Sequence, residues 1–223
     1  MIRAVFFDVG GTLLRPWPSV GTVYSEVGKQ FGFQASEDAM EQAFRGAWKK
    51  LKSAKLETLT TSDKEWWRAL VFEAVASLKL HGSEEVKDAY FAALYNAFGQ
   101  PAAWQTYPDA VPAIQTCRSH ALHVGVISNW DQRLRPLLEK MGLSAMFDSL
   151  AISCEVGAEK PDPKIFHAAL RAAGVEPAQA LHVGDAFDED VKAAESVGMR
   201  GLWIDRSDNA ASLLSLVSAA LSA

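Results

Sequence analysis

Short apolar segments alternate with amphipathic segments from residue 104 onward, and this alternation constrains the fold more than any other feature. The expected strands are 122–127, 150–152, 180–183 and 201–204, and the expected helices are 108–120, 131–141, 163–173, 188–196 and a last one that ends near 221. Strands that alternate with helices form βαβ units around a parallel sheet. The sequence therefore predicts an α/β fold with a doubly wound parallel sheet.

A further apolar run, 4–7, lies near the start of the chain and leads directly into Asp8, which Gly10 and Gly11 closely follow. Three apolar residues immediately before Asp8 are typical of a fully buried strand. The two glycines break that strand and let the backbone approach a ligand closely. We expect 4–7 to join the sheet, which places Asp8 at the carboxyl edge where open α/β sheets bind ligands.

The region between these two parts has a helical pattern from about residue 19 to residue 98. Four helices are expected in it, and the third begins at a capping box formed by Ser62 and Glu65. Pro16 and Pro18 indicate a stiff connector without regular structure before the first helix. We therefore expect an α/β domain of residues 1–15 and 102–223, with an all-helical domain of residues 16–101 inserted into it.

Composition and charge narrow the class of protein. The 223 residues carry a net charge of −5, which provides no electrostatic basis for binding nucleic acid or an anionic membrane surface. Cys117 and Cys154 are too few for a disulfide framework. No signal peptide is visible, and no apolar run approaches the ~20 residues of a membrane span. We expect a soluble cytoplasmic protein that is a monomer or a homodimer.

Polar residues follow three further strands at the points where they end. Ser128 and Asn129 follow 122–127, Lys160 follows 150–152 after a loop, and Asp185 follows 180–183. Each has an ordinary structural explanation alone, such as a helix cap, a surface lysine or an acidic helix start. The carboxyl ends of parallel strands meet at one edge, however, so these residues are expected to converge on Asp8. Carboxylates, a lysine and a hydroxyl together suit a divalent cation and a phosphoryl group.

In combination these motifs resemble the haloacid dehalogenase superfamily, in the group with a helical cap inserted after the first motif. The resemblance extends over essentially the whole chain. The motifs that carry it are Asp8 with Thr12, Ser128-Asn129, Lys160-Pro161-Asp162-Pro163, and Gly184-Asp185 with Asp190. It implies a Rossmann-like core, a helical cap domain and a hydrolase that acts on a small phosphorylated molecule with Mg²⁺.

The resemblance also implies a role for each motif residue. Asp8 would be the nucleophile that forms an aspartyl phosphate, and Lys160 would offset its charge. Asp8, the backbone carbonyl of Gly10 and Asp185 would hold Mg²⁺, and Asp190 would lie behind them or reach the metal through water. Ser128 and Lys160 would bind the phosphoryl oxygens, with Thr12 and Asn129 as further substrate-binding candidates.

One position departs from the pattern of the superfamily. Its phosphatases carry a second Asp two residues after the nucleophile, which protonates the leaving alcohol and then activates water. Gly10 stands at that position here. Loss of a general acid–base group typically lowers a rate by about 10²–10⁴-fold. The sequence therefore predicts a weak or specialised phosphohydrolase, in which another residue or water supplies the proton or the substrate has a good leaving group.

Two other interpretations stay open at this point. The chain is also compatible with a phosphonatase or dehalogenase, relatives that lack the second Asp. Lys49, Lys50, Lys52 and Lys55 are candidates for a phosphonatase Schiff base, although such a charged segment is usually a solvated face. Asp185 and Asp190 count against a dehalogenase, which needs no metal. A third interpretation is a nearly inactive protein that binds a phosphorylated ligand or a partner.

Overall fold

The computed structural model describes residues 1–53, 63–207 and 212–222, which form two compact units. The first, here called the core unit, comprises Met1–Arg15 and Thr106–Ala223. The second, the helical unit, comprises Pro16–Gln105 and so ends later than the residue 101 expected from the sequence.

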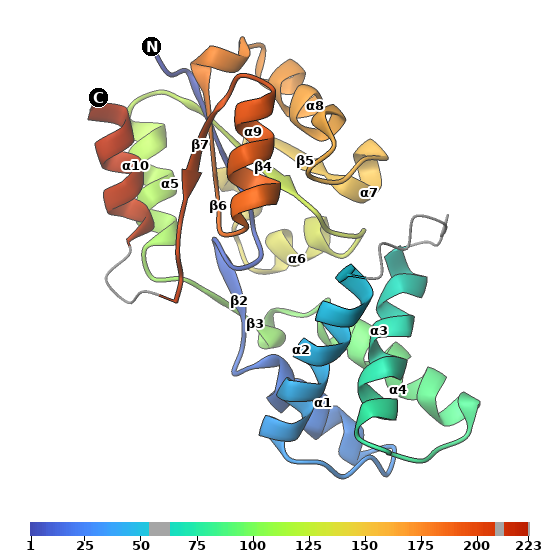
Figure 1. Ribbon diagram of the computed structural model, residues 1–223. Helices are drawn as coiled ribbons and strands as arrows, with labels where there is room; N and C mark the ends of the chain where they lie inside the picture. Colours follow the sequence, from blue (N-terminus) through green and yellow to red (C-terminus); the bar gives the residue numbers. More distant parts are fainter. Residues whose placement is uncertain (54–62, 208–211, 223) are drawn as a thin grey trace. The chain divides into compact units, whose positions relative to one another are not determined.

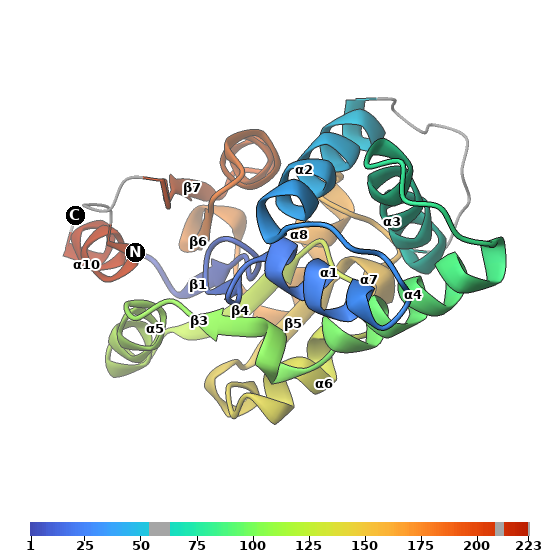
Figure 2. The ribbon, with the colours of Figure 1, turned by 90° about the horizontal axis from the view of Figure 1, so that it is seen from below.

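The core unit contains a five-stranded sheet in which every pairing is parallel. The strand order is β5-β4-β1-β6-β7, as Figure 2 shows. The strands are β1 (Ala4–Phe7), β4 (His123–Ser128), β5 (Ser149–Ile152), β6 (Ala180–Gly184) and β7 (Arg200–Trp203). All of β1 is buried because it lies at the centre of the sheet, between β4 and β6. The predicted parallel α/β fold, with 4–7 as one of its strands, is confirmed.

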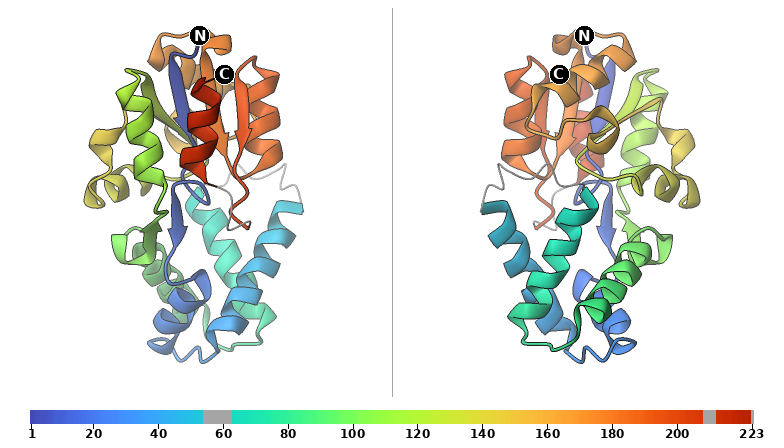
Figure 3. Two further views of the ribbon diagram at one scale, coloured as in Figure 1. Left: turned by 90° about the vertical axis from the view of Figure 1, so that its left-hand side faces the viewer. Right: turned by 90° about the vertical axis from the view of Figure 1, so that its right-hand side faces the viewer.

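Helices cover both faces of this sheet. They are α5 (Ala110–Ser119), α6 (Leu134–Lys140), α7 (Ser153–Val156), α8 (Pro163–Ala173), α9 (Ala193–Ser196) and α10 (Leu213–Ser222). Helices α5 and α10 lie side by side on one face, and α8 and α9 lie on the other (Figures 1 and 3). Phe6 of β1 packs with Ile165 and Phe166 of α8 in one apolar cluster. Burial of these faces holds the strand ends in place around the site.

Two helices of the core unit differ from their predicted bounds. The helix expected from residue 131 begins at Leu134, because the Asp131 carboxylate accepts the Arg133 backbone N–H at 2.9 Å and closes a turn first. The helix expected over 188–196 is a wide π-turn, η4 (Phe187–Lys192), followed by α9. Short 3₁₀ turns complete the connections at η1 (Pro101–Ala103), η2 (Ser144–Met146) and η3 (Pro177–Gln179).

The helical unit consists of α1 (Val20–Lys29), α2 (Glu37–Ser53), α3 (Asp63–Ser77) and α4 (Glu84–Ala97). Each helix packs against two others, α1 on α2 and α4, and α3 on α2 and α4. The core of this unit is aromatic: the Tyr90 ring lies 5.0 Å from the Phe33 ring, and its hydroxyl donates to the Tyr24 carbonyl at 2.8 Å. Ser62 of the predicted capping box, and Lys55, lie outside the described residues.

The connector with two prolines is more regular than the sequence suggested. Residues Leu14–Pro16 form β2, which pairs with β3 (Trp104–Thr106) in a two-stranded sheet. Pro16 is the last residue of its strand, where a missing N–H does not interrupt a ladder. Among the helices that the structure describes, none is both long and apolar enough to cross a membrane.

Candidate active site

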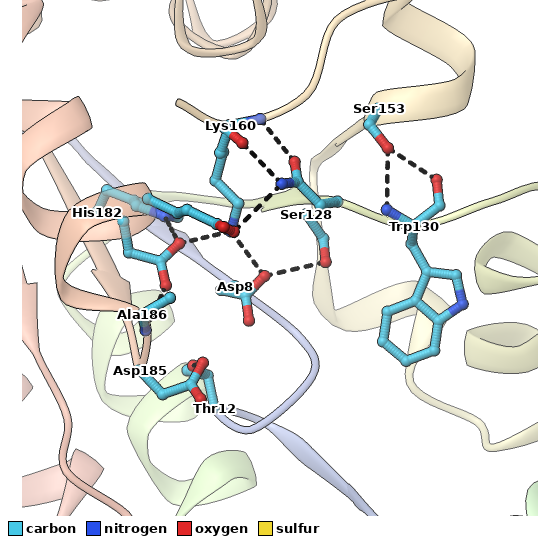
Figure 4. Close-up of polar contacts among 12 residues, drawn as sticks. Asp8, Thr12, Ser128, Trp130, Ser153, Lys160, His182, Asp185 and Ala186 are labelled. Atoms are coloured by element: carbon cyan, nitrogen blue, oxygen red, sulfur yellow. Dashed lines mark hydrogen bonds and ion pairs between the residues drawn. The ribbon is translucent and has the colours of Figure 1, made fainter. Parts of the chain in front are cut away.

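The polar residues expected at the strand ends converge on Asp8, directly after β1 (Figure 4). Lys160 Nζ lies 2.8 Å from Asp8 Oδ1, and Ser128 Oγ donates to the same oxygen at 3.0 Å. Ser128 is the last residue of β4, and Lys160 lies in the segment between β5 and α8. All three side chains are buried. Since both contacts go to Oδ1, the Oδ2 oxygen of Asp8 is left for other chemistry.

Lys160 is shared between two carboxylates. Its Nζ lies 2.8 Å from Asp8 Oδ1 and 2.5 Å from Asp190 Oδ1. Burial by itself would lower the pKa of Lys160, but the negative charges of Asp8 and Asp190 outweigh it and hold the pKa above its usual range. The ammonium group therefore stays charged.

Asp8 is not fully compensated by this lysine. Burial raises the pKa of Asp8 and Asp190 raises it further, whereas Lys160 lowers it, and the net pKa lies above the ordinary value. The single ammonium group of Lys160 faces the two buried carboxylates of Asp8 and Asp190. The charge balance of the site therefore favours a second cation.

Asp190 is held by the wide turn and by His182, a residue whose role the sequence did not reveal. His182 Nε2 lies 3.0 Å from Asp190 Oδ1, and the Ala186 backbone N–H donates to Asp190 Oδ2 at 2.9 Å. Burial alone would raise the pKa of Asp190, but the hydrogen bond from His182 and the charge of Lys160 hold the pKa below its usual range. Asp190 is therefore ionised and fully engaged.

Asp185 is the acid of this cluster for which the described residues provide no ion-pair partner. It follows β6, and its Oδ1 lies 3.5 Å from Thr12 Oγ1. Asp185 is exposed as a residue, but desolvation of its carboxylate raises its pKa, repulsion from Asp8 and Asp190 adds to this, and the pKa is about 7. Within residues 1–53, 63–207 and 212–222, no lysine, arginine or histidine forms an ion pair with it.

Two glycines make room for these acids. A Cβ on Gly11, which has φ +81°, would overlap the Asp185 carboxylate, and a Cβ on Gly184 would overlap the Asp190 carboxylate. Gly11 also needs its left-handed conformation, which other residues adopt at a cost. The sequence identified Gly11 as a strand breaker, but its contact with Asp185 depends on how β1 and β6 pair.

Asn129 and Thr12, both expected to bind substrate, make other contacts. Asn129 Nδ2 donates to the Lys160 carbonyl at 2.9 Å, and the Lys160 N–H donates to Asn129 Oδ1 at 2.6 Å. Thr12 is fully buried, and its carbonyl accepts from Arg206 Nη2 at 2.6 Å. Asn129 thus positions Lys160, and the Thr12 hydroxyl lies next to Asp185, so the substrate-binding role of both residues stays a prediction.

The acidic cluster has the chemistry of a divalent metal site. Asp8, Asp185 and Asp190 each offer a carboxylate oxygen, and these oxygens lie within 4.8 Å of one another. Carboxylate oxygens are the ligands that Mg²⁺ prefers. Because Asp190 already contacts Lys160 and His182, Asp8 and Asp185 are the carboxylates still open to a cation, which suits the expected assignment.

The sequence and the fold of this chain were compared with those of known proteins. The family described as haloacid dehalogenase-like hydrolase matches residues 2–198. The chain is 35% identical to haloacid dehalogenase-like hydrolase domain-containing protein 3 of Bos taurus, over 91% of this chain and 82% of that protein. It is 30% identical to a glyceraldehyde 3-phosphate phosphatase of Methanopyrus kandleri, over 92% of this chain and 85% of that protein.

A solved structure supports the same assignment. The crystal structure of a haloacid dehalogenase-type phosphatase from Thermococcus onnurineus is similar with a TM-score of 0.61 and 27% sequence identity. The similarity covers 95% of this chain and 91% of the other. With a family match over most of its length and a shared fold, the chain belongs to the haloacid dehalogenase-like hydrolases.

Proposed function

We propose that this hydrolase is a Mg²⁺-dependent phosphatase that acts on a small phosphorylated molecule through Asp8. The observation that carries the proposal is the Asp8 carboxylate, buried between Lys160 at 2.8 Å and Ser128 at 3.0 Å, with Asp185 in the same acidic cluster. The glyceraldehyde 3-phosphate phosphatase among the relatives supports the same reaction class.

Asp8, Lys160 and Ser128 would each have a different role in phosphoryl transfer. Asp8 Oδ2 carries no hydrogen bond in the described part of the chain and is the oxygen available to attack phosphorus. A carboxylate nucleophile divides one difficult step into two easier ones, through an aspartyl phosphate that water then hydrolyses. Lys160 and Ser128 are positioned to interact with the phosphoryl oxygens as charge shifts onto them.

A metal would complete the charge balance. Asp8, Asp185 and the carbonyl of Gly10 are the residues that we propose hold Mg²⁺, with Asp190 behind them. The bound ion would supply positive charge that offsets the repulsion between these acids and an anionic substrate. The raised pKa of Asp185, about 7, is what an uncompensated metal ligand is expected to have.

The other activities considered have less support. Lys49, Lys50 and Lys52 are exposed on α2, and Lys50 pairs with Glu73 at 2.7 Å, so these lysines have the environment of a solvated face. A dehalogenase needs no metal, and Asp185, unlike Asp190, forms no ion pair among the described residues that would account for it without one. The remaining alternative, a protein that binds a phosphorylated ligand without hydrolysing it, is distinguished from a phosphatase by the phosphate-release assay below.

The test is release of inorganic phosphate from a panel of phosphate esters, with and without Mg²⁺. Asp8→Asn is expected to lower kcat by about 10³-fold or more, because the nucleophile is removed. Asp188→Asn is the matched control, since Asp188 is an exposed acid of η4 that pairs with Lys192. Turnover that is unchanged in Asp8→Asn would refute the nucleophile assignment, and ligand binding without phosphate release would favour the binding protein.

A further inference from the structure

The Trp130 indole lies beside the point where a side chain on Gly10 would begin. A Cβ built on Gly10 would lie 3.3 Å from Cζ3 and 4.0 Å from Cε3 of the Trp130 indole. Carbon atoms in favourable contact lie about 3.5–4.0 Å apart. The contact with Cζ3 is tighter than that, so a side chain at position 10 would require the indole to shift by a few tenths of an ångström.

The position of this tryptophan is set by its neighbours. The Ser153 hydroxyl accepts the Trp130 N–H at 3.0 Å and donates to the Trp130 carbonyl at 3.0 Å, and the indole points away from Ser153 (Figure 4). Trp130 also follows Ser128 and Asn129 directly, and both of those are tied to the site. Trp130 is half-buried, so it is not wholly enclosed by the protein.

Among the described residues around Asp8, the remaining carboxyl is that of Asp185, which we assign to the metal rather than to proton transfer. Lys160 Nζ is held between the carboxylates of Asp8 and Asp190, and both oxygens of Asp190 already have partners. His182 is fully buried behind Asp190. The indole of Trp130 has no acidic proton in the neutral range. A leaving group that departs without a proton from the enzyme departs as an anion.

We infer that Trp130 is a specificity-determining residue, and that it restricts the enzyme to phosphates with a planar, weakly basic leaving group. Aryl and acyl phosphates belong to this class, because an aryloxide or a carboxylate is stable without a proton and has a flat face that can pack on an indole. This inference rests on the proposed function and names its substrate class.

The reaction balances without an enzyme acid. As the bond between Asp8 Oδ2 and phosphorus forms, the bond from phosphorus to the leaving oxygen breaks, and that oxygen keeps the electron pair and leaves as an anion. A water molecule then attacks phosphorus, the bond to Asp8 breaks with its electron pair returning to the carboxylate, and the proton of water passes to solvent. The products are inorganic phosphate and the leaving-group anion.

The first test measures kcat/KM for p-nitrophenyl, phenyl and ethyl phosphate, in order of rising leaving-group pKa, with acetyl phosphate as the acyl member. We expect p-nitrophenyl and acetyl phosphate to react fastest, and ethyl phosphate slower by at least the ~10²–10⁴-fold that a general acid contributes. Similar kcat/KM values across the series would overturn the inference.

The second test is a double-mutant cycle. Gly10→Asp alone is expected to leave ethyl phosphate a poor substrate, since a Cβ at position 10 would already lie 3.3 Å from the indole and hinder the new side chain. Gly10→Asp with Trp130→Ala is expected to raise kcat/KM for ethyl phosphate about tenfold or more, within the range of a restored acid. Trp130→Ala alone provides the space without the acid and is the matched control. A full gain in Gly10→Asp alone would refute the role of the indole.

A third measurement isolates packing on the ring. Trp130→Ala is expected to raise KM for phenyl phosphate about fivefold or more, the effect of losing an aromatic pair, with Trp130→Phe retaining most of the affinity. An unchanged ratio of phenyl to ethyl phosphate turnover in Trp130→Ala would contradict the inference. Turnover that depends on Asp8 and Mg²⁺ but not on the leaving group would overturn only this inference. If no substrate is turned over, or if turnover persists without Asp8, the proposed function is overturned as well.

Discussion

Lys160 is the residue on which the electrostatics of the site depend. Its ammonium group lies between Asp8 and Asp190, and Asn129 binds both backbone polar groups of the lysine. Each acid is buried, and a buried carboxylate without a nearby cation is unfavourable. Lys160 thus favours the ionised form of the Asp8 nucleophile, whereas burial and the charge of Asp190 raise the pKa of that carboxyl.

We predict that Lys160→Met destabilises the folded chain by about 3–5 kcal/mol at pH 8, because it leaves two buried acids unpaired. The loss is expected to be smaller at pH 5, where those acids take up protons. Urea unfolding at both pH values measures it. Lys192→Met is the control, since Lys192 and Asp188 are exposed, and its effect is expected to stay below about 1 kcal/mol. A Lys160→Met variant as stable as the native chain at pH 8 would contradict the charge argument.

Asp185 gives the site its dependence on pH. Its pKa of about 7 lies above the ordinary value of 3.8, so protonation competes with metal binding below pH 7. In the metal-free chain, this group's contribution to stability falls as pH rises from 3.8 through about 7. We predict that Mg²⁺ raises the Tm more at pH 8 than at pH 6. Asp185→Asn is expected to abolish both the rise and its pH dependence, whereas an equal rise at both pH values would refute the prediction.

At the scale of elements, turns at the ends of β1 and β6 carry the acids. Gly11 leaves space for Asp185, and Gly184 leaves space for Asp190 beneath the wide turn of η4. The turn returns the chain so that Asp190 meets His182, which stands two residues before Gly184 on the same face of β6. The end of β6 and the η4 turn therefore hold the Asp190 carboxylate together.

We predict that Gly184→Ala costs about 1–3 kcal/mol of stability, because its Cβ has to displace the buried Asp190 carboxylate. Activity is expected to fall as Lys160 loses its second partner. Gly46→Ala is the matched control: Gly46 lies in α2 with nothing within 4 Å of an added Cβ, and alanine is expected to stabilise that helix by about 0.5–1 kcal/mol. Denaturant unfolding measures both variants, and a neutral Gly184→Ala would contradict the packing described.

At the scale of the whole molecule, the core unit ties together distant parts of the chain. Arg206 follows the last strand, yet it donates to the Thr12 carbonyl at 2.6 Å and pairs with Asp109 at 2.9 Å. Its guanidinium also stacks on the Tyr107 ring at 4.0 Å. These contacts hold the loop after β1, which contains Gly10 and Gly11, from the opposite end of the sequence.

We predict that Arg206→Met destabilises the chain by about 1–3 kcal/mol, because it removes hydrogen bonds from the Thr12 carbonyl and from Asp109. It is also expected to weaken the Tm rise produced by Mg²⁺, since the loop carrying the Gly10 carbonyl loses its support. Arg135→Met removes an exposed pair with Glu155 and is expected to cost less than about 1 kcal/mol. Equal effects of the two variants would show that the Arg206 contacts do not support the loop.

Local sequence patterns were enough to predict the parallel α/β fold. They also predicted that Asp8, Ser128, Lys160 and Asp185 lie at or after the carboxyl ends of its strands. Periodicity, glycine breaks and proline positions act over a few residues, so they can be read without knowing what packs against them. The absence of an acid at position 10 is likewise a property of the sequence. The bounds of α6 and the wide turn of η4 were not predicted, because side-chain hydrogen bonds and packing on Gly184 determine them.

The contacts that orient the site depend on packing between segments far apart in the chain. Asn129 binds a backbone 31 residues away, and Arg206 reaches a carbonyl 194 residues away. Trp130 meets Gly10 only because β1 and β4 are neighbours in the sheet. Residue types and short spacings therefore specify which chemical groups this hydrolase carries. The pairing of its strands specifies which of them touch, because side-chain contacts form only after the sheet has brought the loops together.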